Sequence, residues 1–378
     1  MGVIPFDPTE RTSDARQTGI AARARLDTSG IYFFVSGPTH GFRGAKLWGG
    51  EEHMAGTDPL NGFTVSLDDV AMIGSGLSRP ESVLCFRSGD IFVSHRPGGV
   101  GWLKPDNSIA RIGTSEDIVP NGIARLADGS FLLANHRDAG GVYRLTTDGQ
   151  PRPFVMEADG ARLPSVNFVY RDHQLRIWLC ISSPRGGDDQ YRHNVDDGYI
   201  ALVEGGKARI VADGLCWTNE CRLNAAGDML YVNETFGRRL TRFRVKPNGE
   251  LTDRALVTQF SRDTFPDGLA MDAHGDLWVV AVGSNRLIHV ARDGRQRIVL
   301  EDSDPEHMQR LADVLDNHKL TRPMLMNNQS RKLKNVSSIA FAGEDRRTAV
   351  LGCLGGDALA TFRLPIAGAE PSHWNDRV

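Results

Sequence analysis

The segment from Phe265 to Gly283 reads Phe-Pro-Asp-Gly-Leu-Ala-Met-Asp-Ala-His-Gly-Asp-Leu-Trp-Val-Val-Ala-Val-Gly. Apolar residues alternate with their neighbours on both sides of His274-Gly275-Asp276, with the period of two that is typical of β-strands. Gly275 suits a tight turn between two strands, because glycine adopts a positive φ without steric cost. Asp267-Gly268 is predicted to form a further turn, before the first strand.

The same pattern recurs along the chain. Val119-Pro-Asn-Gly-Ile-Ala-Arg-Leu-Ala-Asp-Gly begins one copy, and Trp217-Thr-Asn-Glu-Cys-Arg-Leu-Asn-Ala-Ala-Gly begins another. Six copies align on positions 81, 121, 167, 219, 267 and 337, and two further strands follow most of them. Repeats of about 40–50 residues with four short strands are typical of propeller blades. The sequence therefore predicts an all-β fold, a six-bladed β-propeller with four-stranded antiparallel blades.

The repeats also predict the limits of the propeller. The chain reaches only the third strand of the sixth repeat, so the strand Val70–Ile73 is expected to supply the fourth and close the ring, which removes a free sheet edge. The propeller is predicted to span 66–365, with a partly helical insertion at 302–334. Residues 1–65 would form an N-terminal extension or cap, and 366–378 a C-terminal tail.

Composition narrows the class of protein. The 378 residues are 40% hydrophobic and 24% charged, and the net charge of −3 gives no sign of a nucleic-acid surface or an anionic membrane surface. No segment has the apolar length of a membrane span, and the first thirty residues lack the apolar core of a signal peptide. The five cysteines lack paired spacing, which favours buried free thiols in a reducing, cytoplasmic protein.

The six aligned positions hold the residues that predict the binding chemistry. In a propeller, equivalent positions from every blade converge on the central channel, and here they hold two carboxylates, three amides and a hydroxyl. In chain order they are Glu81, Asn121, Asn167, Asn219, Asp267 and Ser337. Such an oxygen-rich set suits a hard divalent cation, calcium above all. Asn-Gly and Asp-Gly are also favoured turn residues, but turn formation does not explain Glu81 or Asn167.

Several short motifs, in this order and spacing, resemble one known family. They are Arg79-Pro-Glu-Ser-Val, Val166-Asn, Trp217-Thr-Asn-Glu, Val232-Asn-Glu-Thr-Phe-Gly-Arg-Arg-Leu, and Pro266-Asp-Gly-Leu-Ala-Met-Asp with Leu277-Trp-Val. The chain resembles the senescence marker protein/gluconolactonase family of six-bladed propellers, which includes regucalcin-type gluconolactonases and is related to the diisopropylfluorophosphatases. The likeness covers about residues 66–365.

The resemblance implies a metal-dependent hydrolase. Glu81, Asn219 and Asp267 would be ligands of one divalent ion, and Asn167 a further ligand or a substrate contact. Calcium is the usual metal, with zinc or manganese in some members, and the family reaction is hydrolysis of a lactone or another activated ester. Two positions depart from the family pattern. Ser165 stands where sugar-lactone members often carry an arginine, and Glu234 stands where the usual residue is aspartate.

Loops after the second strand of each repeat are expected to line the substrate pocket. His95 and His136 are taken to occupy matching positions in adjacent blades, where they could bind substrate or relay protons. The predicted substrate-binding residues are Asn121, His95, His136, Arg185 and Glu234.

In the predicted mechanism, a metal-bound carbonyl is attacked by water, which opens a sugar lactone or related cyclic ester. Asp267 is the predicted catalytic residue, as general base or as a group that orients water, and pure metal ligation is the alternative for it. A phosphotriesterase-like hydrolase and a non-catalytic binding propeller are the rival functions. The expected partner is a small lactone or ester, with no nucleic acid and no membrane.

Overall fold

The computed structural model describes residues 26–27, 30–31, 59–327 and 329–378. The chain divides into two units, Met1–Gly56 and Thr57–Val378. In the first unit the described residues form a two-stranded antiparallel hairpin, β1 (Leu26–Asp27) with β2 (Gly30–Ile31). Most of the predicted N-terminal extension, 1–65, lies outside the described residues.

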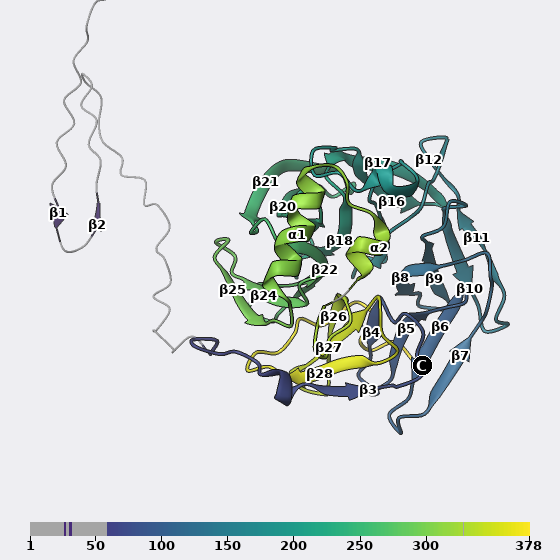
Figure 1. Ribbon diagram of the computed structural model, residues 1–378. Helices are drawn as coiled ribbons and strands as arrows, with labels where there is room; N and C mark the ends of the chain where they lie inside the picture. The colour runs from purple at the N-terminus through teal and green to yellow at the C-terminus, as the bar shows by residue number, and fades with distance from the viewer. Residues whose placement is uncertain (1–25, 28–29, 32–58, 328) are drawn as a thin grey trace, which may run out of the picture. The chain divides into compact units, whose positions relative to one another are not determined.

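The second unit is a ring of six antiparallel blades, as the repeats predict (Figure 1). Each blade has an innermost, a second, a third and an outermost strand. The innermost strands contact one another around the ring, so they surround a central channel. The innermost strands are β4 (Val83–Cys85), β8 (Pro120–Arg125), β14 (Phe168–Arg171), β18 (Thr218–Leu223), β22 (Phe265–Met271) and β26 (Val336–Ala342).

The remaining strands follow outward in each blade. The second strands are β5 (Ile91–His95), β9 (Phe131–Asn135), β15 (Ile177–Ile181), β19 (Met229–Glu234), β23 (Leu277–Val282) and β27 (Thr348–Cys353). The third strands are β6 (Gly99–Leu103), β10 (Val142–Leu145), β16 (Gly198–Glu204), β20 (Arg239–Val245), β24 (Arg286–Val290) and β28 (Leu359–Arg363). The outermost strands are β7 (Ile109–Ile112), β11 (Pro151–Val155), β17 (Lys207–Leu215), β21 (Leu251–Gln259), β25 (Gln296–Leu300) and β3 (Ala71–Ile73).

The last blade joins the two ends of the ring. β3 pairs antiparallel with β28, with Leu359 opposite Ile73 and Thr361 opposite Ala71, and a short 3-10 helix (Leu67–Asp69) precedes β3. The predicted ring closure is therefore confirmed. The third blade is larger than predicted, because β12 (Glu157–Ala158) and β13 (Ala161–Arg162) extend it beyond β17.

Apolar side chains pack between neighbouring blades. One such cluster joins Leu84 and Phe92 of the first blade to Ile123 and Leu133 of the second. Because every blade is covered on both faces, the innermost and second strands are almost entirely buried. All five cysteines are free and buried in this packing, as expected.

The innermost strands are irregular where the aligned residues lie. The pairing of β22 with β23 shifts between Pro266 and Leu269, and β8, β18 and β26 show the same kind of shift. Asp267-Gly268 thus lies in a β-bulge within a strand, and the prediction of a turn there was wrong. A bulge re-aims a side chain without ending the strand, and bulges are frequent beside active sites.

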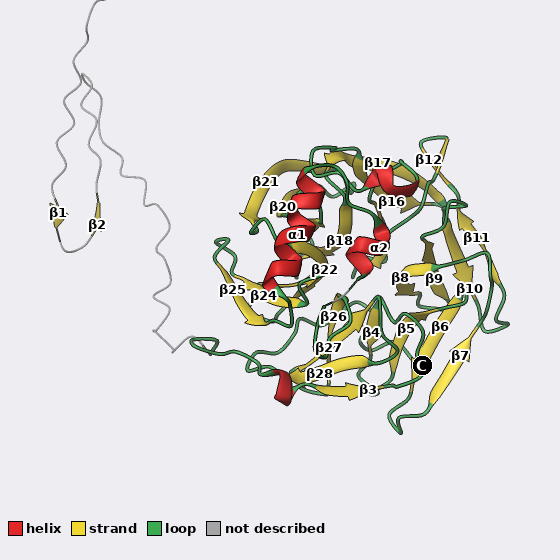
Figure 2. Ribbon diagram, viewed as in Figure 1, coloured by secondary structure: helices red, strands yellow, loops and turns green. Residues whose placement is uncertain are grey.

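Two helices lie in the segment 302–334, on one face of the ring (Figure 2). α1 (Pro305–Asp316) begins after Asp304, whose side chain accepts a hydrogen bond from the His307 N–H. α2 (Arg322–Met326) follows. Met308 and Leu311 of α1 are buried in a cluster with Phe265 at the start of β22.

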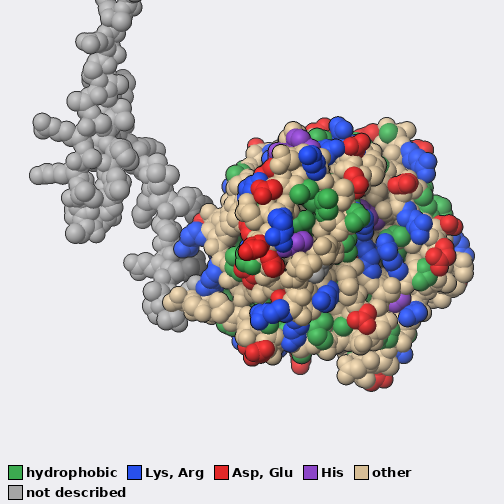
Figure 3. Space-filling view, viewed as in Figure 1, with side chains coloured by type: hydrophobic (Ala, Val, Ile, Leu, Met, Phe, Trp, Pro, Cys, Tyr) green, Lys and Arg blue, Asp and Glu red, His purple; other side chains and the backbone are tan. Residues whose placement is uncertain are grey.

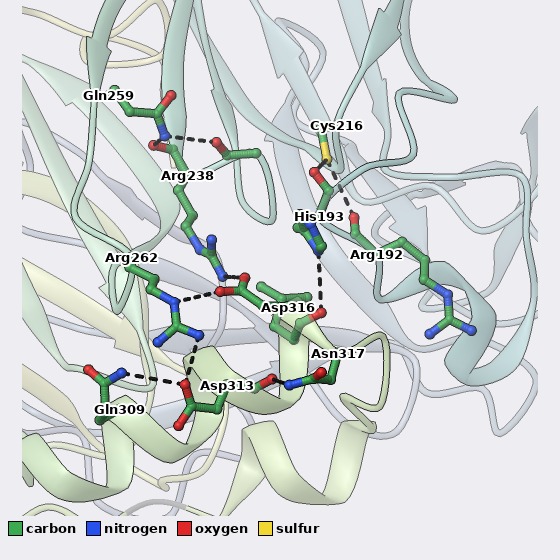
Figure 4. Close-up of polar contacts among 12 residues, drawn as sticks. Arg192, His193, Cys216, Arg238, Gln259, Arg262, Gln309, Asp313, Asp316 and Asn317 are labelled. Atoms are coloured by element: carbon green, nitrogen blue, oxygen red, sulfur yellow. Dashed lines mark hydrogen bonds and ion pairs between the residues drawn. The ribbon is translucent and has the colours of Figure 1, made fainter.

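Ion pairs hold the end of α1 against the fourth blade (Figure 4). Asp316 pairs with Arg238 and Arg262, and Arg262 also pairs with Asp313 at 2.7 Å. The helix is thus held by apolar contacts on one side and by charge pairs at its C-terminal end. Among the described residues, no helix is long and apolar enough to cross a membrane.

Candidate functional site

A small cavity of about 50 Å³ lies at the end of the channel where the innermost strands begin. Five of the six aligned positions line it: Glu81, Asn121, Asn167, Asn219 and Asp267. The cavity therefore brings together the four predicted metal-binding residues and two of the predicted substrate-binding residues, Asn121 and His136. Ser337, the sixth aligned residue, instead donates a hydrogen bond to the Glu81 carbonyl at 3.0 Å.

Glu81 has one oxygen engaged and one oxygen unpartnered. The Asn121 side chain donates to Glu81 Oε1 at 2.9 Å, while Oε2 is buried and accepts no hydrogen bond from the described residues. Arg79 in turn donates to Asn121 Oδ1 at 2.6 Å, which fixes the orientation of that amide. The amide of Asn167 is fixed as well, because its Nδ2 donates to Ser182 Oγ at 2.9 Å.

Asn219 presents its carbonyl oxygen to the cavity. Its Nδ2 donates to Thr235 Oγ1 at 3.0 Å, so Oδ1 points away from Thr235, and that oxygen is buried without a donor among the described residues. Thr235 Oγ1 donates onward to the Pro266 carbonyl at 2.7 Å, beside Asp267. Buried acceptors without a donor cost free energy, so a positively charged group is the natural partner of these oxygens.

The electrostatics of the cavity favour a cation. Burial raises the pKa of Glu81 to about 8, against the opposing effect of Arg79. Burial, and then the negative charges of Glu81 and Glu220, hold the pKa of Asp267 well above its usual range. Buried carboxylates whose pKa values are raised in this way are stabilised in ionised form by a divalent ion. The donor set thus fits a hard cation with oxygen ligands.

Glu220 belongs to this network although the sequence alone did not single it out. It follows Asn219 in the β18 bulge, and its Oε2 accepts from Arg222 at 2.8 Å and from the Leu269 N–H at 3.1 Å. Burial raises its pKa to about 7. The bulge breaks the simple alternation along β18, and the Glu220 side chain reaches the Leu269 N–H of the neighbouring innermost strand, β22.

His136 is a neutral hydrogen-bonding group. Burial, followed by the charges of Arg79, Arg322 and Arg96, lowers the pKa of His136 to about 3. Arg322 Nη1 lies 3.4 Å from His136 Nε2, and a guanidinium can only donate, so Nε2 accepts. Nδ1 then carries the proton and donates to Ser165 Oγ at 3.0 Å. This arrangement supports substrate binding by His136 and argues against a proton relay at neutral pH.

The cavity opens beside an outer hollow of about 910 Å³, and His136 and Arg322 line both. Arg96 and Arg137 also line the hollow, and Figure 3 shows basic side chains on this face. Glu116, Asp117 and Asp138 line it too, which offsets the arginine charges. α2 covers the cavity itself, through Arg322, Leu325 and Met326.

The structure places His95, Arg185 and Glu234 elsewhere. His95 ends β5 and is equivalent to Asn135 at the end of β9, so Arg96, not His95, matches His136. A shift of one residue turns a strand side chain to the other face, which is why His95 is absent from the described lining of the cavity. Arg185 is half exposed and pairs with Asp197 at 2.8 Å.

Glu234 is a structural group. Its side chain is fully buried and accepts from the Cys216 N–H at 2.7 Å, from Arg239 and from Thr241. Both carboxylate oxygens are therefore engaged within the fourth blade, and Glu234 does not line the described cavity.

A second acidic cluster, of Asp272, Asp276 and His289, also has its atoms close enough for a metal. Asp272 already accepts from the His274 and Asp276 N–H groups and from Trp278 Nε1. The third blade repeats this contact, because Trp178 Nε1 donates to Asp172 at 3.0 Å. The cluster is thus explained by a hydrogen bond that holds the hairpin turn to the second strand.

The comparisons with known proteins identify the family of the chain. Residues 96–302 match the model of the SMP-30/gluconolactonase/LRE-like region, which is more than half of the chain. The chain belongs to this family. The prediction made from its motifs is therefore confirmed.

A Bacillus subtilis (strain 168) protein, YvrE, named as a sugar lactone lactonase, is 28% identical over 120 residues. The aligned part is 30% of this chain and 38% of that relative's length. The chain therefore matches well under half of this curated relative.

Solved structures show the same fold. A gluconolactonase of Xanthomonas campestris is 17% identical, with a TM-score of 0.58 over 80% of this chain and 90% of that one. A calcium-binding regucalcin of Agrobacterium tumefaciens is 14% identical, with a TM-score of 0.59 over 81% of this chain and 97% of that one. At such identities the likeness establishes the shared propeller and leaves the activity to be argued from the site.

Proposed function

We propose that this protein is a metal-dependent hydrolase that opens a lactone, a sugar lactone or related cyclic ester. The observation that carries the proposal is the convergence of Glu81, Asn219 and Asp267 on one buried cavity, where no described residue donates to Glu81 Oε2 or to Asn219 Oδ1. Membership of the SMP-30/gluconolactonase/LRE-like family and the names of the relatives support the same reaction class.

Glu81, Asn219 and Asp267 would hold one divalent ion, with Asn167 beside them as a further ligand. Ca²⁺ is the first choice for a site of carboxylate and amide oxygens, and Zn²⁺ or Mn²⁺ are the alternatives. A calcium-binding relative of the same fold supports that choice. When bound, such an ion polarises a carbonyl and stabilises the oxyanion that forms on attack by water.

The residues of the chain have distinct tasks in this proposal. Asn121 and Arg79 orient Glu81, and Thr235 orients Asn219. Asp267 either orients the attacking water as a base or serves as a ligand only. α2 excludes bulk water from the cavity, and a substrate larger than a few waters requires α2 to move, because the cavity holds only about 50 Å³.

Arg322 is the proposed contact to substrate oxygens. Ser165, where relatives often carry an arginine, hydrogen-bonds to His136, and Arg322 from the insertion reaches the same ring. The insertion thus supplies the Arg322 guanidinium near Ser165, the position where relatives often carry an arginine. The hollow outside has arginines and acids in similar number, which suits an oxygen-rich, uncharged lactone.

Replacing Asp267 with Asn tests the function. We expect lactone hydrolysis to fall by at least about 100-fold, because a carboxylate at the metal is lost. The assay uses aldonolactones, aromatic lactones and phosphotriesters, with metal-stripped protein reloaded with Ca²⁺, Zn²⁺ or Mn²⁺. Turnover of phosphotriesters alone would favour the phosphotriesterase alternative. Absence of metal-dependent turnover on every substrate would favour a non-catalytic binding propeller.

The five free, buried cysteines support a reducing, cytoplasmic location, which stays a prediction.

A further inference from the structure

We propose that the opposite end of the channel is a second binding site, which takes a small organic anion with an apolar body. This site is separate from the proposed hydrolytic cavity and does not depend on that function. The innermost strands begin at the Glu81–Asp267 cavity and end at a larger cavity of about 360 Å³. That volume lies within the range of pockets that hold small organic ligands.

The walls of this cavity are mainly apolar and come from all six blades. Five innermost strands contribute one buried apolar residue each, namely Leu84, Ile123, Phe168, Met271 and Phe341. β18 contributes Leu223. Binding of an apolar group of matching shape in an apolar cavity of this size is favourable, because it removes apolar surface from water.

Arg171 places a partly engaged guanidinium group inside these walls. Its side chain is 4% exposed, and Nη2 donates to the Ser372 carbonyl at 2.7 Å and pairs with Asp376 at 2.8 Å. Nη1 and Nε are buried and have no acceptor among the described residues. Leaving two guanidinium donors without acceptors is costly, so an anion or ordered water is needed to satisfy them.

The surrounding charges leave an excess of positive charge. Arg125 and Arg222 also line the cavity, and Arg222 pairs with Glu220 at 2.8 Å. Glu370 adds a carboxylate to the lining, but it already pairs with Arg346 at 3.6 Å. Arg171 pairs with Asp376, whereas Arg125 has no carboxylate partner within the described part of the chain. Arg125 Nη2 donates to the Arg377 carbonyl at 3.3 Å, whereas Arg125 Nε is buried and has no acceptor among the described residues. One carboxylate on a ligand would balance this charge.

The C-terminal segment closes the cavity. Ser372 Oγ donates to the Arg171 carbonyl at 2.6 Å, and the Arg87 N–H donates to the Trp374 carbonyl at 3.0 Å. Trp374 is buried against the last and first blades. Exposed residues remain at the edge of the cavity, including Ala225 of the β18–β19 hairpin turn, and they mark the side from which a ligand enters.

Calorimetric titration of the full chain tests this site. Benzoate and octanoate are the probes, and benzyl alcohol and 1-octanol are their uncharged counterparts. We expect one molecule of carboxylate to bind per chain, at least about tenfold more tightly than the matching alcohol, because only the carboxylate accepts from Arg171. Equal binding of acids and alcohols would overturn the proposal. No binding of either would overturn it as well, and would mean that water occupies the cavity.

Two variants locate the binding. Arg171→Gln should weaken carboxylate binding by about tenfold or more, whereas Arg295→Gln, at an exposed turn, should leave it unchanged. Because Arg171 also holds the C-terminal segment, Ala225→Trp provides a second arm that narrows the entrance and leaves every ion pair intact. The assignment would be wrong if carboxylate binding were unchanged in both Arg171→Gln and Ala225→Trp. It would also be wrong if the carboxylate competed with lactone hydrolysis, because the anion would then bind at the other cavity.

Discussion

Arg322 Nη1 lies 3.4 Å from Nε2 of His136, although the two residues are 186 positions apart. One belongs to the insertion between the fifth and sixth blades, and the other follows the second strand of the second blade. Their contact means that the insertion contributes directly to the proposed site.

Replacing Arg322 with Gln tests this contribution. We expect kcat/KM for lactone hydrolysis to fall by about 10- to 100-fold, mainly through KM, because a charged donor to substrate oxygens is lost. Arg310→Gln is the matched control, since Arg310 lies on α1 of the same insertion and is largely exposed. An unchanged KM in Arg322→Gln would show that the insertion covers the cavity without contacting substrate.

Glu81 and Glu234 are both buried, and their replacement should have opposite effects. In Glu81→Gln, the thermal stabilisation by Ca²⁺ should disappear, while metal-free stability changes little. A site saturated at about 100 times its Kd stabilises the wild type by about 2.7 kcal/mol, which is measurable as a calcium-dependent rise in Tm.

Glu234→Gln should instead destabilise the metal-free protein by about 2–4 kcal/mol, because Arg239 and the Cys216 N–H lose a charged partner. Its calcium-dependent rise in Tm should remain. Loss of that rise in Glu234→Gln, or its persistence in Glu81→Gln, would contradict the proposed ligand set.

Much of the fold could be predicted from the sequence, because the same pattern of strand and turn residues recurs in every blade. The turn at Gly275 and the alignment of Asp267 with Asn219 both follow from local pattern. His95 was misplaced because repeats were matched by residue type, and an offset of one residue sends a strand side chain to the other face. Arg322 had no such pattern, since only the tertiary fold brings an insertion to the channel.

Gly268 is required by the close approach of two blades. A Cβ there would lie 2.5 Å from both the Ser337 carbonyl oxygen and the Ser338 Cα, and backbone cannot move aside cheaply. We expect Gly268→Ala to lower the free energy of unfolding by about 1–3 kcal/mol, measured by urea denaturation. Gly186→Ala is the control, since a Cβ at Gly186 meets nothing within 4 Å. Equal stability of the two variants would contradict the close packing of β22 against β26.

His373 should make stability depend on pH. Burial, and then the charges of Arg171 and Arg222, lower its pKa from 6.5 to about 3. The residue is partly exposed, but its Nε2 is buried and its ring centroid lies 4.9 Å from that of Phe86. Between about pH 6.5 and pH 3, His373 is therefore protonated in the unfolded chain and neutral in the folded chain. The stability that depends on neutral His373 is complete above pH 6.5 and is lost as the pH falls through that window.

His373→Phe keeps the packing and removes the titrating group. We expect the unfolding free energy of the variant to fall less steeply than that of the wild type below pH 6.5, by at most about 1.4 kcal/mol per pH unit. Urea denaturation at several pH values between 6.5 and 4 measures the difference between the two slopes. His274→Gln, in an exposed hairpin turn, should retain the wild-type slope. Parallel curves for His373→Phe and the wild type would mean that His373 is protonated in the folded protein, where an anion beside Arg171 would have to balance its charge.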